Sequence, residues 1–302
     1  MTKIQTLLLT IAAAGRMAAQ ETTIRMDVNL VVINVTVYGK DGKFILGLGK
    51  EAFKIFEDDV ERPITTFHGE DAPVTAGILV DNSASMKTKR SEVIAAALAF
   101  ARSSNPADQM FVIHFNERAR FGLPGIRPFT DSIPELETAL SRYATGGSTA
   151  LYDGIGVALS HFRRASIDRK VLLTISDGGD NSSKAALSDM LRWAGESGVA
   201  FYCIGFFDGD HDRNPGVLKQ FAQSTGGRAF FPENVTDTTN ICVTVAREIR
   251  AQYTLGFAGA QDGKYHRIRI TARNALNELL DVRGRPGYKS VEPNLRDSVP
   301  PK

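Results

Sequence analysis

The stretch AGILVDNSASM, residues 76–86, decides how this chain folds. An apolar strand runs directly into a D-x-S-x-S loop that contains Asp81, Ser83 and Ser85. Open α/β sheets bind their ligands at the carboxyl ends of the strands, which is where this loop would lie. Because one carboxylate and two hydroxyls offer only oxygen atoms, the loop favours a hard divalent cation such as Mg²⁺ over zinc.

Two later segments also place oxygen-bearing side chains at the ends of elements. GGSTALYDG, residues 146–154, is a glycine turn that opens a helix, with Thr149 at the turn. KVLLTISDG, residues 170–178, is a second apolar strand, and it leads into Asp177. Taken singly, the serines could cap the next helix and Asp177 could lie in a turn. That interpretation does not explain why the three segments occur together.

In this order the three segments resemble the von Willebrand factor type A domain and its metal-ion-dependent adhesion site. The resemblance implies that Asp81, Ser83, Ser85, Thr149 and Asp177 hold the metal. The expected cation is Mg²⁺, with Mn²⁺ or Ca²⁺ as alternatives. The implied function is a non-enzymatic module for protein binding or adhesion, in which a partner's Asp or Glu carboxylate replaces a water on the cation.

The alternative function is that of an accessory subunit of an ATPase or chelatase machine, as some domains of this type are. A neighbouring ATPase gene would favour the accessory subunit. An exported chain would count against it, because ATP is scarce outside the cytoplasm.

Strands and helices alternate over residues 74–252, which predicts βαβ crossovers and a doubly wound, mostly parallel sheet. The expected strands are 74–80, 110–115, 171–175, 199–206 and 228–231, with a short edge strand near 118–121. The expected helices lie near 89–103, 133–143, 151–164, 184–195, 216–224 and 236–252.

Both flanks of this α/β domain read as β structure. Residues 20–72 contain short Val- and Ile-rich runs separated by turns, and residues 253–288 include a stretch in which apolar and polar side chains alternate. Since neither flank is large enough to hold a core alone, we expect one antiparallel β-sandwich into which the α/β domain is inserted. Residues 289–302 are expected to be a flexible tail.

This layout resembles a group of von Willebrand factor A-related exported proteins that is prominent in acidobacteria. Their pattern includes F-x-V-x-E-D-G in a β-rich head and R-x-G-Y near the end. Here FKIFEDD at 53–59 and RPGY at 285–288 match approximately, with Asp59 where glycine is usual.

The bulk composition excludes some classes of partner. The 302 residues include 36 basic and 34 acidic side chains, and this near-neutral balance gives no case for nucleic acid. Residues 1–19 are expected to be a signal peptide, because Lys3 precedes an apolar run that ends in small residues, although Arg16 lies near the cleavage point. We therefore expect export to the periplasm or beyond. No other apolar stretch is long enough to span a bilayer.

Catalysis is not expected from this sequence. His114 ends a strand near the site, so a nucleophile pair with Ser83 is conceivable, but no G-x-S-x-G elbow exposes the serine. The phosphate-binding pattern G-x-x-x-x-G-K-[ST] does not occur. Two cysteines, Cys203 and Cys242, either pair or remain buried thiols. The oligomeric state is left open by the sequence.

Overall fold

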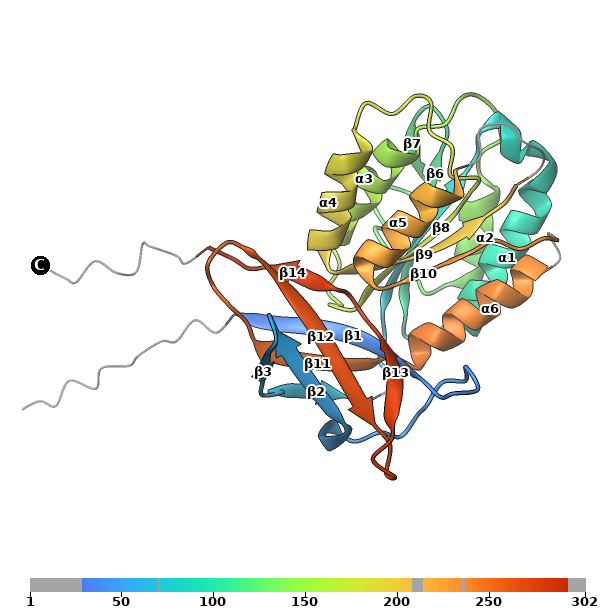
Figure 1. Ribbon diagram of the computed structural model, residues 1–302. Coiled ribbons are helices and arrows are strands. Elements are labelled where there is room, and N and C mark those ends of the chain that lie inside the picture. Colours follow the sequence, from blue (N-terminus) through green and yellow to red (C-terminus); the bar gives the residue numbers. More distant parts are fainter. Residues whose placement is uncertain (1–28, 70, 208–213, 235–236, 293–302) are drawn as a thin grey trace, which may run out of the picture.

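The computed structural model describes residues 29–69, 71–207, 214–234 and 237–292, which form two units (Figure 1). One unit is an α/β layer structure, and the other is an antiparallel sheet built from both ends of the chain. The predicted signal peptide at 1–19 lies outside the described residues. Among the helices that are described, none is long and apolar enough to cross a membrane.

The α/β unit contains a sheet with the strand order β10-β9-β8-β5-β6-β7. Every neighbouring pair is parallel except β6 and β7, which are antiparallel. The predicted doubly wound, mostly parallel sheet is therefore confirmed. Its strands are β5 (Thr75–Asp81), β6 (Gln109–Phe115), β7 (Ala119–Phe121), β8 (Lys170–Ser176), β9 (Val199–Gly205) and β10 (Arg228–Phe230). All residues of β5 are buried, as expected of a central strand that is covered on both faces.

Helices cover this sheet in two layers. Helix α1 packs against α2 and α6, while α4 packs against α3 and α5 on the opposite face (Figure 1). The helices are α1 (Arg90–Ser103), α2 (Ile133–Ser141), α3 (Leu151–Phe162), α4 (Leu187–Ser197), α5 (Pro215–Thr225) and α6 (Asp237–Arg250), and the 3₁₀ turn η2 (Ala84–Lys89) precedes α1. Helix α4 begins later than expected, because the Asp153 carboxylate accepts hydrogen bonds from the backbone of Lys184 and Ala185 and holds them in the preceding loop.

The second unit is one continuous, curled antiparallel sheet with the order β3-β2-β12-β13-β1-β11-β4, and β14 pairs with β12. This sheet confirms that both ends of the chain fold together around the inserted α/β unit. Its strands form one continuous curled sheet, whereas the predicted sandwich would have two sheets facing each other. Its strands are β1 (Leu30–Tyr38), β2 (Phe53–Glu57), β3 (Val60–Arg62), β4 (Thr66–His68), β11 (Tyr253–Ala258), β12 (Tyr265–Arg273), β13 (Leu279–Arg283) and β14 (Gly287–Lys289), with a 3₁₀ turn η1 (Lys50–Ala52) before β2.

Two sequence expectations concern single positions in these units. Strand β14 includes Lys289, the first residue of the expected tail, and the next residue, Ser290, is buried and donates its backbone N–H to the Lys264 carbonyl. Residues 293–302 lie outside the described part of the chain.

Cys203 and Cys242 are both buried and free, so they do not form a disulfide.

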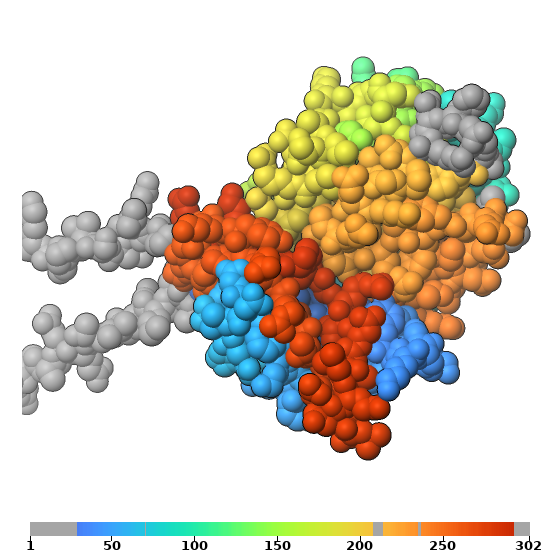
Figure 2. Space-filling model, in the orientation of Figure 1, coloured from blue at the N-terminus to red at the C-terminus, as the bar shows by residue number. Residues whose placement is uncertain are grey.

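The chain crosses between the two units twice, and the two crossings lie side by side. Asp71 lies on the crossing from β4 to β5, and its carboxylate binds the Arg250 guanidinium at the end of α6 through two contacts of 2.7 Å. The buried Arg169 donates to the Ala72 carbonyl on the first crossing and to the Ile249 carbonyl beside the second. Figure 2 shows the C-terminal strands in close contact with the α/β unit, where Lys289 and Glu196 of α4 form an ion pair.

Candidate metal site

The candidate site lies at the carboxyl edge of the α/β sheet, where two central strands end together. Strands β5 and β8 are parallel neighbours in a register that pairs Val80 with Ile175. Asp81 ends β5, and Asp177 directly follows β8. The chain winds from β5 toward β6 on one side and reaches β8 on the other, so this is the point at which the strand order reverses. Ligands of open α/β sheets bind at such crevices.

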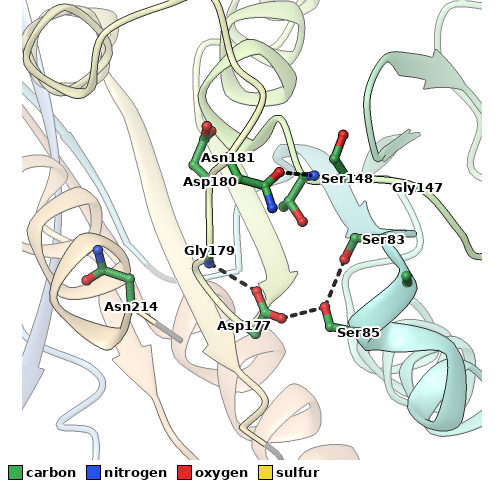
Figure 3. Close-up of a pocket in the computed structure, with 11 residues that line it drawn as sticks. Ser83, Ser85, Gly147, Ser148, Asp177, Gly179, Asp180, Asn181 and Asn214 are labelled. Carbon is green, nitrogen blue, oxygen red and sulfur yellow. Dashed lines mark hydrogen bonds between the residues drawn. The ribbon is translucent and has the colours of Figure 1, made fainter. Parts of the chain in front are cut away.

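Three side chains from the two loops form a continuous chain of oxygen atoms. The hydroxyls of Ser83 and Ser85 lie 3.1 Å apart, and the Ser85 hydroxyl donates to Asp177 Oδ2 over 2.6 Å (Figure 3). The second oxygen of Asp177 accepts the backbone N–H of Gly179 at 3.0 Å, which fixes the plane of the carboxylate. Ser83 is buried and Ser85 is exposed, so the row of oxygens leads from the interior to the surface.

Asp81 lies beneath this row and is engaged on both oxygens. Its Oδ1 accepts the backbone N–H of Ser83 at 2.8 Å, and its Oδ2 accepts the hydroxyl of Ser176 at 2.6 Å. Burial raises the pKa of Asp81 to about 6, although the hydrogen bonds from Ser176 and Ser83 act in the opposite direction. A carboxylate held in this way orients the loop that contains Ser83 and Ser85, which we call the serine loop. Because both of its oxygens are engaged, it is better suited to contact a cation through water than directly.

Thr149 supplies a hydroxyl with no other role among the described residues. Its backbone N–H donates to Asn181 Oδ1, and its carbonyl accepts the N–H groups of Asn181 and Ser182. These contacts hold the residue, which is 7% exposed, against the loop that follows β8. Within the described part of the chain its Oγ1 has no hydrogen-bond partner, and the residue lines the same cavity as the two serines.

The cavity has a volume of about 410 Å³, and most of the residues that line it carry polar side chains. Four of the five predicted residues line it, namely Ser83, Ser85, Thr149 and Asp177, while Asp81 lies below. Sequence reasoning did not assign a role to the other polar residues that line it, which are Ser148, Asp180, Asn181 and Asn214. Asp180 and Asn181 follow Asp177 after two glycines, and this polar stretch of sequence was the signal that could have identified them.

Glycine at position 178 allows the loop after β8 to approach the start of α5. Gly178 has φ of +78°, and a Cβ there would come within 2.5 Å of the Asn214 carbonyl oxygen. Asn214 in turn donates its N–H to the Asp177 carbonyl and caps α5 through Val217. The position of the Asp177 carboxylate is therefore fixed by contacts on both sides of its backbone.

The donor set fits a hard divalent cation. Neighbouring ligands in an octahedral Mg²⁺ shell lie about 2.9 Å apart, given Mg–O distances of roughly 2.0–2.1 Å. The Ser83–Ser85 and Ser85–Asp177 separations of 3.1 and 2.6 Å bracket that value. In the described residues no group of three or more His, Cys, Asp or Glu side chains is placed to hold a metal, so hydroxyls are an essential part of this donor set.

The conceivable nucleophile pair of Ser83 and His114 does not form. His114 Nε2 lies 2.8 Å from the Ala139 carbonyl and Nδ1 lies 3.3 Å from Asn82 Oδ1, so both ring nitrogens face other groups. Burial lowers the pKa of His114 to about 4. The side chain is thus a buried neutral imidazole that joins β6 to α2 and to Asn82, which precedes Ser83.

Comparison with known proteins supports the resemblance of the α/β unit to the von Willebrand factor type A domain. Residues 77–242 match the family described as von Willebrand factor type A domain. A von Willebrand factor type A structure from Catenulispora acidiphila is 16% identical and covers 82% of this chain and 74% of its own, with a TM-score of 0.55. Proximal thread matrix protein 1 from the mussel byssus is 16% identical over 62% of this chain and 48% of its own, with a TM-score of 0.50.

An aerotolerance-related membrane protein from Bacteroides fragilis is 15% identical, covers 58% of this chain and 98% of its own, and has a TM-score of 0.47. No curated protein matches the sequence. At these identities the similarity to solved structures establishes the fold alone.

Proposed function

The chain belongs to the von Willebrand factor type A domain family, whose members are generally non-enzymatic protein-interaction modules, and from this membership we propose a divalent-cation-dependent protein-binding or adhesion module. The observation that carries the proposal is the row of oxygens formed by Ser83, Ser85 and Asp177 at the carboxyl edge of the sheet. These residues, with Thr149, would hold Mg²⁺, or Mn²⁺ or Ca²⁺, and Asp81 would act through water.

The charge of the donor set explains why a partner's carboxylate would bind there. Ser83, Ser85 and Thr149 are neutral ligands, and Asp177 is the one carboxylate among the cavity-lining residues that faces the serines. The other lining carboxylate, Asp180, is engaged by the backbone of Tyr152 and by Ser183. A divalent cation bound there would have a single carboxylate among its direct ligands, so it would keep positive charge toward the open side of the cavity and attract an anion in this partly desolvated site. An Asp or Glu side chain of a partner protein provides that anion.

The proposal includes a location outside the cytoplasm. It rests on the apolar segment that is predicted to be a signal peptide. N-terminal sequencing of the protein recovered from the periplasm or the medium tests this part separately.

The binding function is tested by capturing partners on the immobilised protein in Mg²⁺ and in EDTA. We expect EDTA to abolish capture, and Asp177→Ala to match that effect. Thr149→Val should weaken capture without lowering the unfolding midpoint, because the Thr149 hydroxyl makes no hydrogen bond within the described residues; Thr149→Ser should bind normally. Capture that survives both EDTA and Asp177→Ala would show that the interface lies elsewhere.

A further inference from the structure

A second and larger hollow lies beside the metal cavity and is lined by residues of α3, α4 and β7. It has a volume of about 1030 Å³, and we call it the α3–α4 groove. Its apolar floor consists of Phe121, Tyr152, Val157, Met190 and Trp193. Phe121 is 40% exposed, and Met190 and Trp193 are only half-buried. Large apolar side chains that stay accessible in a concave surface are typical of protein-binding sites.

Three cationic side chains lie on the rim of the groove. Arg118, Arg164 and Lys184 line it and are exposed. Within the described residues, the charged groups of these three side chains form no ion pair and no hydrogen bond. The lining also contains two carboxylates, Glu117 and Asp153, and Asp153 is already occupied by the backbone N–H groups that precede α4. The rim is therefore net positive, and its positive groups are free to pair with a ligand.

The groove and the metal cavity share a wall. Glu117 lines the groove, and its Oε1 lies within 2.6 Å of the position that a Cβ on Gly147 would take. Gly147 lines the metal cavity. On the other side, the Tyr152 N–H of the groove donates to Asp180 of the cavity at 2.9 Å. A single extended partner segment could thus lie across both.

We propose that the α3–α4 groove docks an acidic, apolar segment of the partner protein whose carboxylate binds the metal. This inference rests on the proposed function and extends it by naming the chemistry of the partner. Apolar side chains of the segment cover Trp193, Met190 and Phe121, and its carboxylates pair with Arg118, Arg164 and Lys184. The charge of the rim and the continuity with the metal cavity favour this occupant over a basic or purely polar one.

Trp193 provides a direct readout, because it is the only tryptophan in the chain. The probe is a short peptide in which Leu and Phe alternate with Asp and Glu, without tryptophan. Its counterpart carries Lys in place of every acidic residue. Addition of the acidic peptide should shift Trp193 emission to shorter wavelength with a saturable dependence on concentration, because the indole becomes covered. The basic counterpart should leave the emission unchanged.

Charge reversal tests the assignment to the rim. The double variant Arg164→Glu, Lys184→Glu should weaken binding of the acidic peptide by roughly tenfold or more, since two charge pairs are lost. The matched control is Lys50→Glu with Lys264→Glu, which makes the same change in net charge at exposed positions of the β unit and should leave affinity within about twofold of the unsubstituted protein because long-range charge is screened.

Failure of the groove and failure of the metal site give different results. Peptide binding to the groove should persist in EDTA and in Asp177→Ala, whereas partner capture through the metal should not. The inference is overturned if the acidic peptide leaves Trp193 emission unchanged, or if the basic counterpart or the charge-reversed variant binds equally well. It is also overturned if Trp193 emission changes with protein concentration alone and sedimentation shows a dimer, because the occupant would then be a second copy of the chain.

Discussion

The Ser85 hydroxyl donates a hydrogen bond of 2.6 Å to the Asp177 carboxylate, although the two residues lie 92 positions apart in the sequence. The contact exists because β5 and β8 are parallel neighbours whose carboxyl ends meet at one edge. It joins the serine loop to the loop after β8 at the point where a cation would take both oxygens as ligands. This contact therefore holds the loop of Ser83 and Ser85 next to the loop that follows β8.

Loss of either aspartate should weaken the binding of Mg²⁺. Asp177→Ala removes the carboxylate that faces the serines, and Asp81→Ala removes the group that orients the serine loop. Each change should reduce the affinity at least roughly tenfold, as is typical when a ligand or its supporting residue is lost. Isothermal titration calorimetry measures this, with Asp189→Ala on the exposed face of α4 as the control. Equal affinity in Asp81→Ala and the unsubstituted protein would refute the assignment of Asp81.

Ser176→Ala should destabilise the fold as well as the site. The Ser176 hydroxyl donates to Asp81 and accepts the Gly178 N–H at 3.0 Å, and all three residues are buried. Its removal leaves two buried polar groups unpaired, which costs about 1–3 kcal/mol each before any relaxation. Urea unfolding of the metal-free protein gives the value. Ser91→Ala, at an exposed position of α1, should change stability by less than about 0.5 kcal/mol; a similar loss in both variants would contradict the role of Ser176.

His114 should make the fold less stable in acid. Burial lowers its pKa from 6.5 to about 4, so between these values the unfolded chain takes up a proton that the folded protein does not. Its contribution is fully present above pH 6.5 and is lost as the pH falls toward 4, by an amount on the order of 3 kcal/mol for this buried side chain.

His114→Gln, which keeps a donor for the Ala139 carbonyl, should remove this dependence. Asp81 and Asp108, whose pKa is raised by burial to about 6, titrate in the same range with the opposite effect. The measurement is therefore the difference between the variant and the unsubstituted protein in EDTA across pH 4–7. A difference that stays constant with pH would contradict the prediction.

Deletion of residues 263–302 should unfold the β unit. It removes β12, β13 and β14, and so takes away the partner that joins β2 to the rest of the sheet and one of the two partners of β1. Apolar side chains such as Phe53 and Ile55, now buried, would become exposed. We expect aggregation in light scattering, whereas a chain of residues 74–252 should remain soluble. A truncated protein that stays monomeric with an intact β spectrum would show that the head folds without the tail.

The sequence predicted the α/β unit well because each of its buried strands is marked by a short run of neighbouring residues. Residues 75–81 and 170–176 are mostly apolar runs that end in Asp or Ser, and this pattern is typical of a buried parallel strand. Since parallel strands end at a common edge, the positions of Asp81 and Asp177 followed from strand assignment alone.

Features that depend on long-range pairing could not be read in the same way. Strand β3 has an exposed Val60 and no alternation, and it is a strand because it pairs with β2. Strand β14 exists through its register with β12. The single curled sheet arises because β13 pairs with both β12 and β1. The role of Ser176 appears only when β8 lies beside β5. The groove beside the candidate metal site appears only when α3 packs on α4.

The paired crossings between the two units have a mechanical consequence. Strand β5 leads straight from the first crossing to Asp81. A force applied at the carboxyl edge of the sheet would therefore be transmitted along that strand to Asp71. Arg250 binds Asp71, and Arg169 binds the carbonyls of Ala72 and Ile249. These contacts would transmit part of the force to the crossing between α6 and β11. Two adjacent connections share an applied force and resist rotation of one unit relative to the other, whereas a single flexible linker would allow that rotation. The two crossings thus restrict rotation of the α/β unit relative to the β unit, and a partner bound as proposed would be held at a set orientation.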